Sequence, residues 1–424
     1  MTADQMNTVD HADAPIAVVG AGIVGVSIAY ELKRRGQAVL LIDRNAPGMG
    51  ASFGNMASIA VTEFMPASRP SVWARIPGWL LDPEGPVCVR PSYLPKLLPW
   101  FVRFLMASSP GKVRELEAQG AVLCKRVYED LLPMLESAGL THMLSQEGCL
   151  SLYANQSELD GDKEHLEVIN RFGFENELLS GAEIRKLEPG LSEEIKFAVL
   201  FPQNRSITDP HLLVKALFDR FTAMGGRFVQ TKVRTLGRSN GAVTHVETEM
   251  GQSLAVSQAI LSAGAYTGAL CKSIGDFIPL ETERGYHAQI MAPGIQLRHS
   301  IIWPARAFMV TPTAGGIRVG GTVEMAGLDA EPDFRRAKVM VKHAQQALPA
   351  LRAEKISEWM GHRPAMPDTV PVMGPSKTTR GVYVATGHGH LGLTYAATTA
   401  RVIADMVTGK PTPIDMRPYR LDRF

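Results

Sequence analysis

The hydrophobic pattern near the start of the chain predicts a β-α-β unit. Residues 16–19 form a short, continuously apolar run, which is typical of a strand buried on both faces. A glycine-rich turn follows at once, and residues 22–35 have the spacing of apolar positions expected of a helix. A second apolar run at 38–42 completes the unit. We therefore expect two parallel strands joined by a helix.

The middle of the chain has a helical pattern first and an alternating pattern later. Residues 112–137 have helical spacing, and residues 149–153 resemble a strand. Asp209 as N-cap and Pro210 in the first turn predict a helix over 211–224. Further strands are expected at 227–233, 242–249 and 254–261, and then around 280–287, 307–312 and 316–323.

The order of these elements predicts an α/β protein with two interwoven domains. At 424 residues the chain is too long for one ordinary core. Its first and last blocks have the alternation of a Rossmann-like, ligand-binding domain, for which we expect residues 14–90, 195–275 and 355–424. Residues 91–194 and 276–354 are expected to form an α+β substrate domain on a mainly antiparallel sheet, and residues 1–13 a flexible, polar extension.

Three glycines after the first strand predict a dinucleotide site. The first permits a tight turn, the second lets backbone approach a pyrophosphate, and the third lets the helix close on the strand. The amides at the helix N-terminus favour phosphate. Asp43 follows the second strand, where a carboxylate accepts hydrogen bonds from ribose hydroxyls. The predicted contacts are Gly20, Gly22, Ile23, Val24, Gly25, Asp43 and Arg44. The alternative is a structural turn that binds no ligand.

A second glycine-rich unit lies near the end of the chain. Residues 381–394 have the pattern of a strand, a turn and a helix N-terminus, with the helix continuing to about residue 407. Two such units require a large ligand, and a flavin dinucleotide satisfies both. An NAD-linked enzyme that uses only the first unit is the alternative.

Composition and charge narrow the class of protein. The chain has 44 basic and 42 acidic residues and no long run of either sign, so we expect no nucleic-acid partner. Its four cysteines are scattered without metal-ligand spacing, which favours a reducing compartment and argues against a zinc or iron–sulfur site. With no signal-like segment and no apolar stretch of spanning length, the expected location is cytoplasmic.

The apolar segment 93–106 has two interpretations. Prolines and basic residues interrupt it, and it carries Trp100, Phe101 and Phe104. It either packs as a helix over the substrate domain or docks on a membrane surface or a partner subunit.

Several segments resemble those of a known family. They are PGMGASFGN at 47–55, TERGYH at 282–287, GHRPAMPD at 361–368 with PVMG at 371–374, and GHGHLGL at 387–393. On these motifs the chain, from about residue 15 to its end, resembles the FAD-dependent D-amino-acid oxidase superfamily, and specifically its D-amino acid dehydrogenase branch.

The resemblance implies FAD as cofactor and adds contacts to it. Those carried over from the family are Ser52, Gly54, Asn55, Val233, Ala263, Gly264, Gly387, His388, Gly389, Leu391, Gly392, Leu393 and Thr394. The family commonly has Glu where this chain has Asp43. Both carboxylates can accept hydrogen bonds from ribose, so FAD is still the expected cofactor and NAD stays the alternative. The pair His388 and His390 has the HxH spacing of metal ligands, but contact with the flavin is the preferred interpretation and no metal is predicted.

The resemblance also implies the substrate residues. Arg363 matches the arginine that holds the substrate carboxylate, and a guanidinium presents a fixed fork of donors for that group. Tyr286, His287 and Arg284 are further candidates for the active site. His287 is equally interpretable as a core histidine, and Arg284 as an ion-pair partner of Glu281 or Glu283. Phe308 falls near an aromatic position of related oxidases, although packing is the preferred role.

The implied activity is FAD-dependent oxidative deamination of a D-amino acid, with proline-type substrates included. Hydride leaves the α-carbon, a quinone or a partner chain receives the electrons, and the imino acid hydrolyses to a 2-oxo acid and ammonia. No general base is required when the amine binds neutral. Two alternatives stay open: an oxidase of glycine or N-methylated amino acids, and an FAD-carrying subunit of a hetero-oligomeric dehydrogenase.

Overall fold

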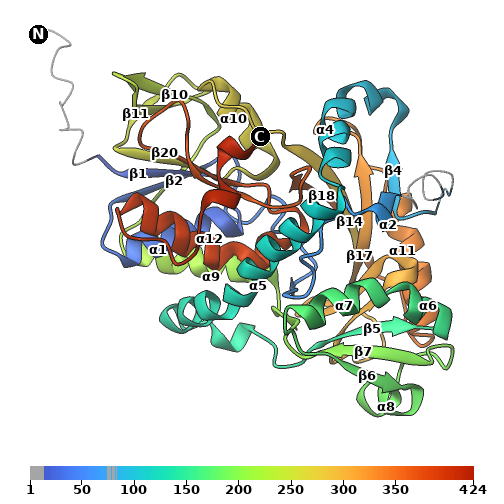
Figure 1. The fold of residues 1–424 in the computed structure, drawn as a ribbon. Coiled ribbons are helices and arrows are strands. Elements are labelled where there is room, and N and C mark those ends of the chain that lie inside the picture. Colours follow the sequence, from blue (N-terminus) through green and yellow to red (C-terminus); the bar gives the residue numbers. More distant parts are fainter. Residues whose placement is uncertain (1–13, 74–77, 79–81, 83) are drawn as a thin grey trace, which may run out of the picture.

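The computed structural model describes residues 14–73, 78, 82 and 84–424. Two large β-sheets organise this part of the chain, each with its own hydrophobic core (Figure 1). The chain passes between the two sheets several times, as the alternation of patterns predicts. A deep cavity is lined by residues from both sheets.

The first sheet has six strands in the order β19-β20-β13-β1-β2-β9. All neighbours are parallel except β19, which runs antiparallel to β20. Parallel sheets are covered on both faces, and the central strand β1 is accordingly buried along its length. The strand bounds are β1 Ile16–Val19, β2 Val39–Asp43, β9 Arg227–Gln230, β13 Gln258–Leu261, β19 Val372–Pro375 and β20 Val382–Thr386.

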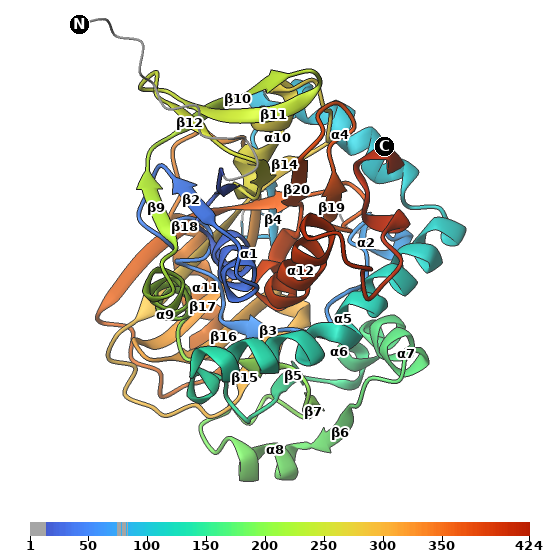
Figure 2. The same cartoon turned by 90° about the vertical axis from the view of Figure 1, so that its left-hand side faces the viewer.

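Helices cover one face of this sheet. The bounds of these helices are α1 Ile23–Arg34, α5 Pro110–Ala138, α9 Pro210–Ala223 and α12 Gly392–Val407. Helix α12 packs against both α1 and α5, and α1 also packs against α9 (Figure 2). The other face carries a small antiparallel sheet and α10, and their bounds are β10 Val233–Ser239, β11 Ala242–Thr248, β12 Ser253–Ala255 and α10 Thr267–Ser273. The Rossmann-like arrangement is thus present.

The second sheet has nine strands and is mainly antiparallel. Its path is β18-β14-β17-β16-β15-β5-β7-β6, and β4 pairs with β17. The bounds are β4 Val87–Val89, β5 Cys149–Tyr153, β6 Glu177–Ser180, β7 Phe197–Phe201, β14 Glu281–Ile290, β15 Ser300–Trp303, β16 Phe308–Thr313, β17 Gly316–Met325 and β18 Ile356–Ala365. Helix α11, Arg335–Ala347, packs on β14, β16 and β17.

The remaining elements lie around these two layers. The helices are α2 Pro70–Trp73, α4 Leu94–Met106, α6 Gln156–Gly161, α7 Lys163–Arg171 and α8 Gly181–Leu187. Strands β3 Ser58–Ile59 and β8 Arg205–Ser206 form a two-stranded ribbon.

The division between the sheets differs from the expected boundaries in several places. Strands β4, β7 and β18 hydrogen-bond into the nine-stranded sheet, although their residues were expected in the Rossmann-like domain. Helix α5, expected in the other domain, packs against α12. The strand expected at 227–233 is two strands, β9 and β10, in different sheets. Local pattern identifies a strand but does not select its partner, which is a property of the tertiary structure.

Candidate functional site

A cavity of about 1190 Å³ extends from the carboxyl ends of β1 and β2 to the face of the nine-stranded sheet. It is larger than the usual small-molecule site and has the size of a dinucleotide site with room for a second ligand. We call the part lined by Gly20, Gly22, Asp43 and Ser52 the cradle end. The part lined by Glu283, Gly285, Phe308 and Arg363 is called the arginine end.

Gly20 and Gly25 in the glycine turn leave no room for a side chain. Gly20 has φ of +110°, and a Cβ there would lie 2.4 Å from the carbonyl oxygen of Ser262. A Cβ on Gly25 would lie 1.8 Å from the carbonyl oxygen of Gly20. Helix α1 therefore begins directly against the turn, with Gly22 as its N-cap. This tight turn at a helix N-terminus is the arrangement that binds a pyrophosphate.

Hydrogen bonds hold the Asp43 carboxylate at the end of β2. The backbone N–H of Ala21 donates to Oδ2 at 2.7 Å, and the N–H of Asn45 donates to Oδ1 at 2.8 Å. Each oxygen keeps a further acceptor site, so the carboxylate remains able to bind ribose hydroxyls. Beside it the guanidinium of Arg44 lies 3.8 Å from the ring centroid of Tyr266, and both residues line the cavity.

The loop after β2 is held by contacts from both domains. Ser52 Oγ accepts the N–H of Ile23 at 2.9 Å, which ties the loop to the start of α1. His287 Nδ1 donates to the carbonyl oxygen of Gly54 at 2.8 Å. The indole of Trp359 stacks on His287 and fills the place of a Cβ on Gly54. The segment 52–54 of this loop is thereby fastened to α1 on one side and to β14 on the other.

His287 supports the loop and does not line the cavity. Burial, and then the nearby charge of Arg318, lower the pKa of His287 to about 4, so the ring is neutral at physiological pH. Its ring contacts the backbone of Gly54 and the indole of Trp359. These contacts fit the alternative interpretation of His287 as a core histidine. We accordingly treat His287 as a positioning residue.

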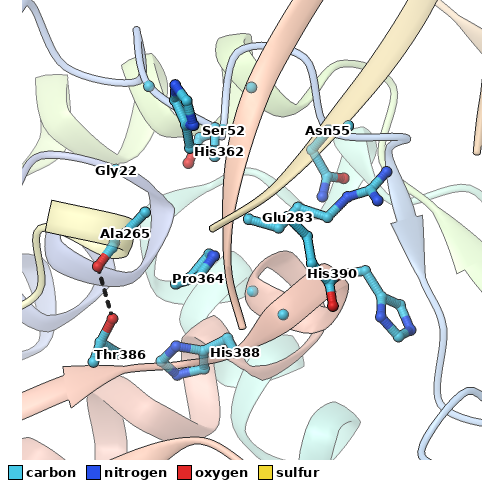
Figure 3. A pocket seen from close by; sticks show the side chains of 18 of the residues that line it. Gly22, Ser52, Asn55, Ala265, Glu283, His362, Pro364, Thr386, His388 and His390 are labelled. Carbon is cyan, nitrogen blue, oxygen red and sulfur yellow. Dashed lines mark hydrogen bonds between the residues drawn. The ribbon is translucent and has the colours of Figure 1, made fainter. Parts of the chain in front are cut away.

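The second glycine-rich unit also reaches the cavity, with His388 and His390 on its turn (Figure 3). His388 Nε2 lies 3.0 Å from Thr399 Oγ1, and burial lowers the pKa of this imidazole to about 4. Thr394 Oγ1 accepts the N–H of Ala60 at 3.1 Å, which joins α12 to the loop after β3. Among the residues that the structure describes, no cluster of side chains has the geometry of a metal site.

Arg363 lines the arginine end of the cavity. Its guanidinium extends over Gly285, where a Cβ would lie 2.5 Å from Nη2, so only glycine leaves room for it. Nη1 donates to the carbonyl oxygen of Thr322 at 3.3 Å. Within residues 14–73 and 84–424 it forms no ion pair, and burial lowers its pKa. The remaining N–H groups form a cationic site for an anion.

Arg284 and Tyr286 face a different set of partners. Arg284 is 1% exposed, ion-pairs with Glu324 at 3.0 Å, and donates to backbone carbonyl oxygens of the loop before α11. Tyr286 donates its hydroxyl to Glu324 and accepts the N–H of Asp333 at 3.0 Å. The ion pair thus forms with Glu324 in place of Glu281 or Glu283. Tyr286 also lines the cavity, but its hydroxyl is bonded to Glu324 and Asp333, and Arg284 is paired with Glu324 on the other face of the strand. We therefore assign neither residue a part in the chemistry.

Most predicted cofactor positions line the cavity. Those that do are Gly20, Gly22, Ile23, Val24, Asp43, Arg44, Ser52, Gly54, Asn55, Val233, Ala263, Gly264, His388, Gly389, Gly392 and Leu393. The other predicted positions do not line the cavity and lie in the elements around it; they are Gly25, Gly387, Leu391 and Thr394. Gly387, with φ of +79°, packs on Met366, and Thr386 Oγ1 donates to the carbonyl oxygen of Gly264 at 2.9 Å (Figure 3).

Sequence reasoning missed one charged residue of the arginine end, Glu283. It lines the cavity (Figure 3), and in the register of the β14–β18 pair it stands opposite Arg363. The alternation of a strand was the available signal, because residues 281, 283 and 285 project from one face and Arg284 from the other. Trp359 and Tyr266 were also missed, and no local motif marks them. Phe308, only 2% exposed, packs against Trp303 and also borders the cavity.

Helix α4 closes part of the cavity. Leu97, Trp100, Phe101 and Phe104 line it, and Trp100 Nε1 donates to the carbonyl oxygen of Ala365 at 3.3 Å. The outer side of this helix is also apolar, with Leu94, Leu98, Val102 and Met106 exposed at four-residue intervals. No helix in the described part of the chain is long and apolar enough to cross a bilayer.

The chain matches known proteins over nearly its whole length. Residues 15–406 match the family described as FAD dependent oxidoreductase. A D-amino-acid oxidase of Bradyrhizobium diazoefficiens is 35% identical, covering 96% of this chain and 98% of the relative. A D-amino acid dehydrogenase of Rhodopseudomonas palustris is 29% identical over 96% of this chain and 97% of its own. The glycine oxidase of Geobacillus kaustophilus has the same fold, with a TM-score of 0.73 at 20% identity over 96% of this chain and 98% of that one.

Proposed function

Since the chain belongs to the family of FAD-dependent oxidoreductases, we propose that it oxidises amino acids, with D-amino acids as the substrate class. The observation that carries this proposal is Arg363, a partly buried guanidinium that lines the cavity without an ion-pair partner in the described chain. A fork of N–H donors in a desolvated site favours a carboxylate. The names of the two curated relatives support the D configuration.

The residues of the cavity fit the cofactor. The turn at Gly20 and Gly25 has no space for side chains, and the Asp43 carboxylate is held where ribose hydroxyls bind. Gly392 and Leu393 begin α12 beside the cavity and supply a second helix N-terminus. FAD, when bound, supplies the two-electron oxidation by accepting a hydride from the substrate's α-carbon.

The chain's own residues orient the substrate and exclude water from it. Arg363 binds the carboxylate, which fixes the α-carbon and selects amino acids over plain amines. Phe308, Leu97 and Trp100 surround this end with apolar surface. The nitrogen lone pair of the neutral amine then assists loss of hydride. The product imino acid hydrolyses to a 2-oxo acid and ammonia, and a proline-type substrate stops at a cyclic imine.

The electron acceptor in this proposal is a quinone or a partner protein. The apolar outer side of α4 is the surface on which a membrane or a partner would dock, and the inner side of the same helix lines the cavity. Oxygen is the competing acceptor, as in the relative named an oxidase. A comparison of turnover with oxygen and with a soluble quinone analogue distinguishes the two.

The substrate class is tested by mixing the purified holoprotein anaerobically with a panel of D- and L-amino acids, glycine and N-methylated amino acids. We expect bleaching of the flavin absorption by D-amino acids and not by the corresponding L-isomers. A preference for glycine or N-methylated amino acids would replace the proposed substrate class. No bleaching by the isolated chain, followed by activity after addition of a second subunit, would show that the chain requires a partner.

A further inference from the structure

Glu283 is a partly buried acid of the arginine end for which the proposed function has no role. It lies on β14 directly opposite Arg363 on β18, and the two residues therefore share a face of the sheet. Both line the cavity. A site with only a guanidinium would bind any carboxylate, whereas an adjacent carboxylate repels simple anions. The pair suits a ligand with a negative and a positive group a few ångströms apart.

The carboxylate of Glu283 is available for such a ligand. It makes no hydrogen bond or ion pair with any residue of the described chain, although Arg363 is close enough to act on it electrostatically. By contrast, Glu281 on the same strand accepts the hydroxyl of Tyr93 at 2.9 Å and 3.0 Å and does not line the cavity. A partly desolvated carboxylate without a partner costs free energy, and such groups are typical of functional sites.

The guanidinium of Arg363 extends over Gly285, and its Nη1 donates to the carbonyl oxygen of Thr322 on β17. Arg363 and Glu283 act on each other electrostatically but form no direct ion pair, and both line the cavity. An amino acid whose carboxylate binds Arg363 has its amino group one carbon away, at the end of the cavity that Glu283 also lines.

We propose that Glu283 binds the α-amino group of the substrate and takes up its proton. This inference rests on the proposed function and deepens it. In solution the substrate is a zwitterion, and its ammonium nitrogen has no lone pair with which to assist loss of hydride. One proton passes from the ammonium nitrogen to a carboxylate oxygen of Glu283, which leaves a neutral amine and a neutral carboxylic acid. Solvent receives that proton after the imino acid has left.

The surroundings of Glu283 favour this transfer. Burial raises its pKa, opposed by Arg363 and reinforced by Glu281, so the acid is a better proton acceptor than an exposed glutamate. Other titratable residues that line the cavity include Glu63, His390, Asp329 and His362. Glu63 and His390 interact with each other and, through His390, with Arg363. Burial and the charges of Arg284 and Arg44 lower the pKa of His362 to about 4, although Asp329 opposes this. Arg284 projects from the opposite face, where Glu324 neutralises it. Hence Glu283 is the carboxylate placed to meet the amine.

Glu283→Gln tests the proposal, because it keeps the shape and removes the proton acceptor. We expect kcat/KM for anaerobic flavin reduction to fall roughly 10²-fold near neutral pH, the usual scale of general base catalysis. The loss should shrink as pH rises toward the pKa of the substrate's own amine, because free neutral amine then becomes abundant. Glu283→Asp, which retains an acceptor, should keep the shallow pH profile of the parent enzyme at a reduced rate.

A binding measurement separates this role from a structural one. Titration with a simple carboxylate that has no amine, followed through the flavin spectrum, should give tighter binding to Glu283→Gln than to the parent, since a negative charge beside Arg363 is removed. Glu281→Gln is the matched control: Glu281 does not line the cavity and acts on Glu283 only through its charge, so its effects on kcat/KM and on carboxylate binding should be much smaller than those of Glu283→Gln. FAD content and circular dichroism establish that each variant is folded.

Two results would overturn the inference while leaving the proposed function intact. One is a parent-like pH profile and rate for Glu283→Gln. The other is a loss confined to amino acids with cationic side chains, which would place the carboxylate against the side chain and not the amine. If no amino acid reduced the flavin of the parent enzyme, the proposed function itself would fail.

Discussion

At the cradle end of the cavity a ligand meets mostly backbone, whereas at the arginine end it meets side chains. The cradle is made by β1, α1 and β2, which are consecutive in the chain, and its Gly20 and Gly25 have no space for a Cβ. The arginine end is assembled from β14, β17, β18 and α4, which are separated by long stretches of sequence. The first end therefore depends on the absence of side chains and the second on their identity.

This difference predicts different consequences of substitution. A side chain added at the cradle collides with backbone, which cannot move without disturbing the six-stranded sheet. A side chain changed at the arginine end leaves the backbone pairing of β14 and β18 in place and alters charge in the cavity. We expect changes at the cradle to affect cofactor binding and stability, and changes at the arginine end to affect turnover.

The largest effect is expected at the arginine end, from Arg363→Ala. Removal of one partner of a buried, hydrogen-bonded charge pair costs about 2–5 kcal/mol, which should appear as a severe loss of kcat/KM for amino acids. Arg363→Lys should be intermediate, because an ammonium lacks the fork that meets a carboxylate. Rapid-mixing measurements of flavin reduction check this, with FAD content unchanged. An unaltered kcat/KM in Arg363→Ala would remove Arg363 from the substrate site.

Gly25→Ala is expected to have the next largest effect, at the cradle end. Its Cβ would lie 1.8 Å from the carbonyl oxygen of Gly20, and such overpacking costs about 1–3 kcal/mol. Retained FAD per chain and the midpoint of thermal unfolding should both fall. Gly111→Ala is the control, because Gly111 lies in α5 with no atom within 4 Å of the added Cβ. Equal behaviour of the two variants would contradict the close packing of the turn.

His287 connects the two ends, since it lies on β14 and holds the cradle loop at Gly54. Its pKa is lowered from 6.5 to about 4, so the unfolded chain takes up the proton first as pH falls. Its contribution to stability is complete above pH 6.5 and declines as pH falls toward about 4, by at most about 1.4 kcal/mol per pH unit. His287→Asn should flatten this part of the curve in urea unfolding measured at several pH values.

His165 provides a control of opposite sign. Its hydrogen bond to Asp162 and the charge of Glu63 outweigh burial and raise its pKa to about 9. Its contribution is complete below pH 6.5 and is lost as pH rises through about 9. His165→Asn should therefore change the alkaline side of the curve and leave the acid side as it is. If both variants altered the same part of the curve of stability against pH, the opposite pKa shifts of His287 and His165 would be contradicted.

The smallest effect on substrate oxidation is expected from the outer side of α4. Leu98→Ser together with Met106→Ser changes exposed side chains and should alter stability by less than about 0.5 kcal/mol each. Anaerobic flavin reduction should be unchanged, while turnover with a quinone embedded in vesicles should fall. A soluble quinone analogue is the control and should show no difference. Equal turnover with both acceptors would argue against docking through this helix.

The cradle end could be predicted from the sequence because its parts are local. The expected strand, helix and second strand correspond to β1, α1 and β2 within one residue at most of their ends. The strand, turn and helix predicted for the second glycine-rich unit likewise correspond to β20 and α12. Such local agreement arises because a glycine turn and a helix start depend on residues close together in sequence.

The arginine end could be predicted only in part. The resemblance identified Arg363, but it also grouped Arg284, Tyr286 and His287 with it, and the structure gives those three other partners. Glu283 was considered only as an ion-pair partner of Arg284 and not as a residue of the site. Which face of β14 meets the cavity depends on pairing with β17 and β18, including the shift in register between Gly285 and His287.

The sequence by itself determined the dinucleotide turn, the alternation of the two kinds of domain and the family, because each rests on spacing within short segments. Tertiary structure alone decided that β18 leaves the Rossmann-like domain to join the nine-stranded sheet, that Arg284 pairs with Glu324, and that Glu283 and Arg363 face one cavity. Charged side chains acquire their chemistry from what surrounds them in space. That environment forms only when distant strands pair.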